Sequence, residues 1–146
     1  MQETALRLTM TDTGEEIVFP DGSAFGVETD LQLIGSGNRL RRTVNAKLVN
    51  ISDPAFDKFL VTLSASDMIL PAIAGLRHGD AVTVECPLVI RERGATPSRP
   101  AVPGTVSTGP GWVEYRPVLD CLVDDPVMSE RESKAEASWS LRLEEV

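Results

Sequence analysis

The chain has 146 residues and a formal net charge of −8, with 42% hydrophobic and 5% aromatic residues. Its length fits one domain, residues 1–146, which can bury an apolar core without metal or disulfide support. The acidic balance argues against nucleic-acid binding as a primary role, sequence-specific recognition included, because such a surface repels phosphate. No apolar run reaches the ~20 residues of a membrane helix, and the polar start does not resemble a signal peptide, so we expect no membrane insertion and synthesis in the cytosol.

Apolar and polar residues alternate through much of the first half of the chain, which is the pattern of a half-buried β-strand. Turn residues at positions 11–14 predict that the first two strands form a hairpin. Leu31 and Leu33 are expected to face the core, and the phase slip after Leu48 indicates a β-bulge or a strand end buried on both faces. The expected strands cover residues 5–10, 15–19, 29–34, 43–51 and 59–65.

Two segments of the first half lack this alternation and predict short helices. Ser52 and Asp53 offer a helix N-cap, and Pro54 fits the first helical position, so a single helical turn is expected at residues 52–57. Residues 67–76 are apolar without a period of two, which favours a short helix from Pro71 that closes one end of the core.

The second half is organised around residues 81–123, which predict two long strands flanking one long loop. A closing strand over residues 135–143 alternates around Trp139 and is expected to pair with the second of these strands. The sequence therefore predicts an all-β domain, a β-sandwich or flattened barrel of about seven or eight mostly antiparallel strands with one or two short helices. The expected core residues are Val82, Val84, Cys86, Leu88, Tyr115, Leu119, Cys121, Trp139, Leu141 and Leu143.

The loop at residues 92–111 holds four prolines and four glycines, and we call it the arm. Loops of this length without internal structure are usually functional or disordered, and proline favours an extended chain. The arm also contains arginines, whereas the protein as a whole is acidic. Our hypothesis is therefore that the arm lies on a neighbouring subunit. A solvent-exposed loop is the alternative. The residues expected to contact that subunit are Arg91, Arg93, Pro97, Arg99, Pro100, Pro103 and Pro110.

The sequence contains no convincing catalytic constellation, and we expect neither an enzyme nor a bound metal or cofactor. His78, the single histidine, lies in a turn without ligands at metal-binding spacing. Cys86 and Cys121 fall in apolar rows, which favours buried free thiols over a disulfide. Trp112 lies at a loop edge and is a possible exposed aromatic; with Tyr115 it could form a sugar-stacking platform, which leaves a carbohydrate-binding module as one hypothesis.

Several segments resemble a family of small virion structural proteins from long-tailed bacteriophages. The similarity runs from about residue 19 to the C-terminus, although Ala65 and Arg77 depart from the cysteine and the tryptophan expected near these positions. The segments that carry it are Arg-Arg-Thr-Val-Asn at 41–45, Ser-Asp-Pro-Ala-Phe-Asp-Lys at 52–58, Leu-Ser-Ala-Ser-Asp at 63–67 with Pro71-Ala72, Gly-Asp-Ala-Val-Thr-Val-Glu-Cys at 79–86, Tyr-Arg-Pro at 115–117 and Trp-Ser-Leu-Arg-Leu-Glu-Glu-Val at 139–146.

This resemblance implies a non-enzymatic structural subunit of the virion, assembled in the cytoplasm of the bacterial host. The favoured place is the tail tip or baseplate, as a distal-tail-like ring or adaptor around the tail axis. The implied partners are copies of the same chain, in a hexameric or trimeric ring, and other virion proteins. A capsid decoration protein or a head–tail connector is the alternative.

Overall fold

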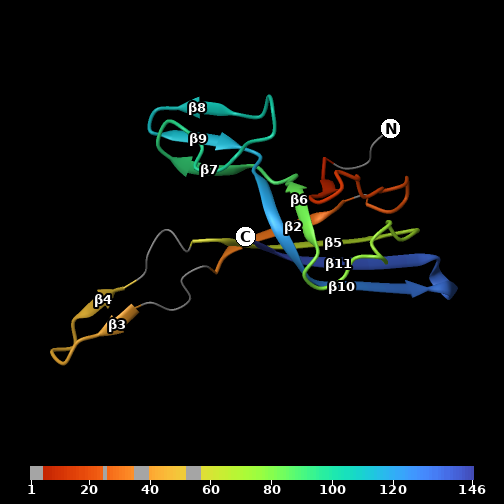
Figure 1. Cartoon of the computed structure of the whole chain (residues 1–146), viewed down its shortest axis with the longest axis horizontal. Helices are drawn as coiled ribbons and strands as arrows, with labels where there is room; N and C mark the ends of the chain where they lie inside the picture. The colour runs from red at the N-terminus through yellow and green to blue at the C-terminus, as the bar shows by residue number, and fades with distance from the viewer. Residues whose placement is uncertain (1–4, 25, 35–39, 52–56) are drawn as a thin grey trace.

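The computed structural model describes residues 5–24, 26–34, 40–51 and 57–146, and these residues form an all-β, antiparallel, sandwich-like fold. A six-stranded sheet has the order β1-β6-β10-β11-β5-β2, and the two edge strands of this order do not pair, so the described strands form no closed barrel. A three-stranded sheet, β7-β9-β8, and a separate hairpin, β3-β4, lie beside it (Figure 1). In chain order the strands are β1 (Arg7–Met10), β2 (Glu28–Leu33), β3 (Leu40–Arg42), β4 (Leu48–Asn50), β5 (Phe59–Asp67), β6 (Ala81–Glu85), β7 (Ile90–Arg93), β8 (Ser107–Gly109), β9 (Trp112–Tyr115), β10 (Val118–Arg131) and β11 (Glu136–Glu145).

The long strand β10 gives the large sheet its two layers. It pairs with β6 only through Val118–Leu122, whereas it pairs with β11 from Cys121 to Arg131. The register with β11 shifts between Val123 and Asp125, and such a bulge bends a strand and increases its twist. The beginning of β10 and β6 therefore run steeply across β5 and β11, and the sheet curls over its own inner face (Figure 1).

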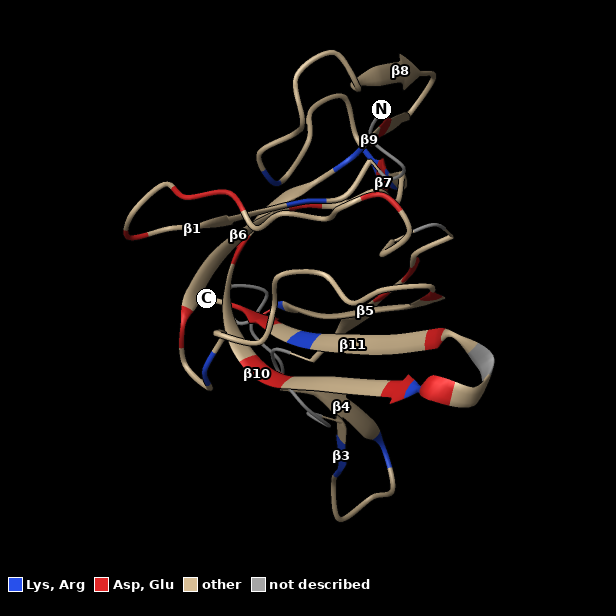
Figure 2. Cartoon of the chain, turned by 90° about the vertical axis from the view of Figure 1, so that its right-hand side faces the viewer, with Lys and Arg blue, Asp and Glu red and all other residues tan. Residues whose placement is uncertain are grey.

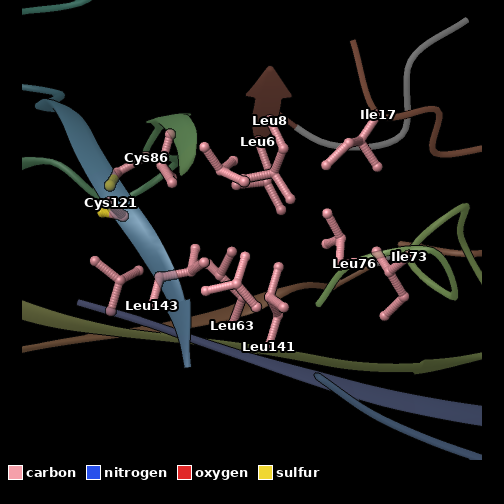
Figure 3. Close-up of a cluster of buried hydrophobic side chains, with 14 of the residues drawn as sticks. Leu6, Leu8, Ile17, Leu63, Ile73, Leu76, Cys86, Cys121, Leu141 and Leu143 are labelled. Atoms are coloured by element: carbon pink, nitrogen blue, oxygen red, sulfur yellow. The ribbon is translucent and has the colours of Figure 1, made fainter. Parts of the chain in front are cut away.

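The inner face of this curled sheet encloses one apolar core (Figure 3). Alternate residues of β5, β6, β10 and β11 supply most of it, because a period of two sends every second side chain inward. The core extends to side chains from β1 and from the turns after β1 and β5. Its fully buried members include Leu6, Leu8, Val61, Leu63, Ile73, Val82, Val84, Leu141 and Leu143.

The structure places the expected core residues in two different layers. Val82, Val84, Cys86, Leu119, Cys121, Trp139, Leu141 and Leu143 lie in the main core, whereas Tyr115 is buried outside this cluster, on the small sheet. The expectation for Leu88 is wrong, because its side chain is 37% exposed. Strand β6 ends at Glu85 and the chain passes Pro87 before β7 begins in another sheet, so the apolar alternation runs across a break between two strands.

Three other expectations from the first half need correction. Residues 15–19 form no strand with β1 beyond the isolated bridge between Thr9 and Glu16. Residues 43–51 are not one strand: they supply the turn and second strand of the β3-β4 hairpin, in which Ala46 has a left-handed φ of 62°. Leu33 of β2 is exposed, whereas Leu31 packs against the core.

The helix expected from Pro71 does not form. The backbone N–H groups of Met68 and Ile69 donate to the carbonyl oxygen of Gly22, and that of Ala72 donates to the carbonyl of Val18. These hydrogen bonds tie the segment to residues 18–22, and the Ile73 and Leu76 N–H groups donate only two and three positions back, which makes turns and no α-helix. The helical turn expected at residues 52–57 falls largely on 52–56, outside the described residues.

The short 3-10 helix η2 (Glu132–Lys134) joins β10 to β11 and is the helical element of the described residues. No helix within the described ranges combines the length and the hydropathy needed to cross a bilayer.

Candidate functional site

The segment expected to be an extended arm is instead folded. Residues 87–117, which we call the lobe, contain the sheet β7-β9-β8, and the Gly94 N–H donates to the Gly111 carbonyl just beyond the last pair of the β7-β9 ladder. Both glycines have positive φ, a conformation that other residues rarely adopt. The Val118 N–H, at the start of β10, donates to the Pro100 carbonyl and ties the middle of the lobe to the body. Pro103 and Pro110 lie in turns of the lobe, so the segment is not one extended chain.

Arg99, an expected inter-subunit contact, is engaged by its own chain. Its guanidinium donates to both carboxylate oxygens of Glu145 at 2.9 and 3.1 Å and to the carbonyl of Asp57 at 3.1 Å. It also lies over the ring of Phe59, 4.2 Å from the centroid. Burial alone would lower the pKa of Arg99, but the hydrogen bonds and charge of Glu145 raise it overall. This pair fastens the lobe to the end of β11.

Arg91 and Trp112 also contact each other within the lobe. Arg91 donates to Glu114 at 2.7 Å and lies 4.8 Å from the centroid of the Trp112 ring. Gly109 packs so closely against this ring that a Cβ there would meet it at 2.2 Å. Trp112 is consequently half-buried, with Arg91 and Gly109 against its ring. Of the other arm residues named above, Arg93, Pro100, Pro103 and Pro110 are exposed on the lobe and Pro97 is half-buried.

A polar network centred on Glu92 stabilises the lobe. The Tyr115 hydroxyl donates to this carboxylate at 2.6 Å, and Ser98 donates through its hydroxyl at 2.8 Å and its backbone N–H at 3.1 Å. Burial alone would raise the pKa of Glu92, but these hydrogen bonds lower it below its ordinary value of 4.5. Burial, with the bond to Glu92, raises the pKa of Tyr115 above 10.0.

We expect this network to make stability depend on pH at both extremes. The carboxylate of Glu92 is favoured by folding, so its contribution is present above the unfolded pKa and is lost as the pH falls through the lower folded pKa. The neutral phenol of Tyr115 is favoured by folding, so its contribution is lost as the pH rises through the raised folded pKa. Urea unfolding of wild type and Glu92→Gln tests the acid limb: their difference in free energy should shrink from about pH 6 to about pH 3. A difference that stays constant over that range would contradict the assignment.

The described residues hold no group of side chains arranged to bind a metal ion. The His78 ring is exposed, and its Nδ1 lies 2.7 Å from the backbone carbonyl oxygen of Asp124. Cys86 and Cys121 are free and buried in the same part of the core (Figure 3), and burial raises the pKa of each thiol to about 12. Cys121 is opposite Val82 in the β6-β10 register, whereas the Cys86 N–H donates to the carbonyl of Pro117, so the two cysteines are not a cross-strand pair.

The surface that the sequence reasoning missed is the β3-β4 hairpin. Figure 1 shows it projecting from the end of the body where β2 ends and β5 begins. Residues 40–50 carry three basic side chains and no acidic one, so this hairpin has a charge of +3 in a chain of −8 and the rest carries −11. Most of its side chains are exposed, apolar ones included: Leu40, Val44, Leu48 and the following Ile51. The Arg41-Arg42 pair beside Val44 was the signal in the sequence, but the alternation of Val44, Ala46 and Leu48 resembled an ordinary strand.

The turn of this hairpin is held by its own hydrogen bonds. The Thr43 N–H donates to the Lys47 carbonyl at 2.9 Å, and the Ala46 N–H donates to the Thr43 carbonyl at 2.9 Å. The Arg42 guanidinium donates to the Ala46 carbonyl at 3.0 Å. Val44 at the tip is fully exposed, so the hairpin presents one apolar side chain between Arg42 and Lys47.

Comparison with known protein families, with curated proteins and with solved structures found no match.

Proposed function

We propose that this protein is a structural subunit that assembles with copies of itself, as a ring or adaptor of the virion of a long-tailed bacteriophage. The observation that carries the proposal is the β3-β4 hairpin, a basic ribbon with exposed apolar side chains on an acidic body. Exposed apolar surface of this kind is typical of sites where a partner binds.

The hairpin also lacks the packing that would make it stable alone. A two-stranded hairpin in water is marginally stable at best and needs a further strand or a packing surface. Only Val49 among its described residues is partly buried. A neighbouring subunit that covers Val44 and Leu48 would supply the missing apolar contact, at roughly 25 cal/mol per Å² of apolar area removed from water.

The position in the virion follows from the resemblance to the phage family. It favours the tail tip or baseplate, with a distal-tail-like ring of six or three subunits around the tail axis. A capsid decoration protein or head–tail connector is the alternative within the same class. The acidic body suits a subunit near DNA that must not bind the phosphate backbone.

Sedimentation velocity of the purified chain over a range of concentrations tests self-assembly. We expect a species larger than the monomer that grows with concentration and weakens with added salt, because salt screens exposed charges. Electron microscopy of that species should show closed rings of three- or six-fold symmetry. A chain that stays monomeric at every concentration would overturn the proposal. Labelled copies located on the tail axis would favour the tail assignment, and copies spread over the shell would favour decoration.

A further inference from the structure

A small cavity lies at the end of the body away from the hairpin root. It has a volume of about 280 Å³ and lies between the turn after β1 and the segment after β5. Met10, Ile17, Val18 and Leu76 supply apolar lining, and Glu15 and Glu16 add carboxylates. Glu16 already pairs with Arg7 at 3.3 Å, whereas Glu15 has no ion-pair partner among the described residues.

The cavity and the hairpin tip are complementary in polarity and in charge. The tip presents the fully exposed Val44 flanked by Arg42 and Lys47, and the cavity offers an apolar recess flanked by carboxylates. Figure 2 shows the same contrast over a wider area, with basic residues on the β3-β4 hairpin and acidic residues in the loop that follows β1. An apolar contact gives an interface buried area, and pairs of opposite charge around it fix the register of the two surfaces.

The two surfaces lie at opposite ends of the same strand. The hairpin root adjoins Phe59, where β5 pairs with the end of β2, whereas the cavity borders the segment that follows Asp67, the other end of β5. The eight steps from Phe59 to Asp67, at ~3.3 Å each, put these ends roughly 26 Å apart. The hairpin of one chain therefore cannot reach the cavity of the same chain. A contact between different patches of two copies is heterologous, and it closes into a ring when the rotation between subunits allows.

We propose that copies of this chain join head to tail, with Val44 of one copy seated in the cavity of the next and its basic neighbours facing Glu15 and Glu16. This interface deepens the self-assembly proposed above and rests on it. It specifies a second copy of this chain as the occupant of the cavity.

Two single variants test the two halves of the interface separately. Val44→Glu removes the apolar tip and opposes the carboxylates, and it should weaken self-association at least ~10-fold because one buried valine is lost. Gly75→Trp fills the cavity from its lining; a Cβ at Gly75 meets nothing within 4 Å, so the backbone should tolerate it. Val106→Glu, at another exposed valine on the lobe, is the matched control and should associate like wild type. Circular dichroism and thermal melts check that every variant folds.

Mixing the two defective variants tests whether the contact between copies is head to tail. Val44→Glu retains an intact cavity and Gly75→Trp retains an intact hairpin, so together they can form one head-to-tail contact. We expect each variant to be monomeric alone and the mixture to give a one-to-one heterodimer that grows no further. A mixture that stays monomeric would overturn the head-to-tail contact, and so would a Gly75→Trp variant that associates by itself, because hairpin-to-hairpin pairing would leave that variant competent.

The remaining outcomes separate this inference from the proposed function. If wild type assembles and either Val44→Glu or Gly75→Trp assembles equally well, the head-to-tail interface is wrong while self-assembly stands. If Val106→Glu weakens assembly as much as Val44→Glu, the effect is one of charge alone and the interface is again wrong. If wild type itself is monomeric, the proposed function fails, and the interface fails with it.

Discussion

Replacing Trp139 with alanine is expected to lower the free energy of unfolding by about 3–5 kcal/mol, the usual cost of removing a large buried aromatic side chain. Trp139 lies on the inner face of β11, and its ring packs against Phe19 with centroids 5.7 Å apart. Its indole N–H donates to the buried carbonyl of Ser23 at 2.7 Å. The substitution therefore removes core packing and a buried hydrogen bond together.

Urea unfolding measures this loss, and Trp139→Phe is the matched control. Phenylalanine keeps much of the apolar contact with Phe19 but leaves the Ser23 carbonyl without its donor, so we expect a smaller loss of about 1–3 kcal/mol. A loss below about 1 kcal/mol for Trp139→Ala would contradict the position of the ring in the core.

Replacing Arg99 with alanine is expected to cost about 2–4 kcal/mol, because it leaves the Glu145 carboxylate half-buried without its partner. The side chains of Arg99 and Glu145 are only 18% and 11% exposed, and the arginine also covers Phe59. Arg91→Ala is the matched control, since Arg91 makes the same two kinds of contact, with Glu114 and Trp112, at 64% exposure. An exposed pair of this kind is worth about 0–1 kcal/mol.

Chemical denaturation of the two variants under one set of conditions compares their free energies of unfolding. This comparison distinguishes a buried ion pair that holds the lobe in place from a surface ion pair. If Arg99→Ala were no more destabilising than Arg91→Ala, the lobe would not be held to β11 by the Arg99–Glu145 pair. The hypothesis that the arm lies on a neighbouring subunit would then regain support.

The strand alternation predicted the main sheet well because it is a local property. Val82 and Val84, like Leu141 and Leu143, are two positions apart, and a strand with one buried face places them together whatever its partners. The same rule went wrong at Leu88, where the apolar row continues although the chain changes sheets at Pro87. Alternation predicts which residues can lie on the same face of a strand, but it does not predict where the chain leaves one sheet for another.

The sequence misled about the conformation of two segments, residues 87–117 and 40–50, for a similar reason. A segment rich in proline and glycine has the same composition whether it extends or folds into short strands. What folds the lobe is the contact of Arg99 with Glu145 and of Glu92 with Tyr115, pairs separated by 46 and 23 residues. The β3-β4 hairpin has the opposite character, because its sequence resembles a buried strand whereas all but one of its described side chains, residues 40–50, are exposed.

The sequence by itself determined that this protein is all-β and antiparallel, which of its alternating rows are apolar, and that its surface is acidic. Only the tertiary structure decided that residues 87–117 fold against the body and that residues 40–50 project from it. The physical reason is the range of the interactions involved. Alternation depends on neighbours two residues apart, whereas the placement of a loop depends on single ion pairs and hydrogen bonds between residues far apart in the chain.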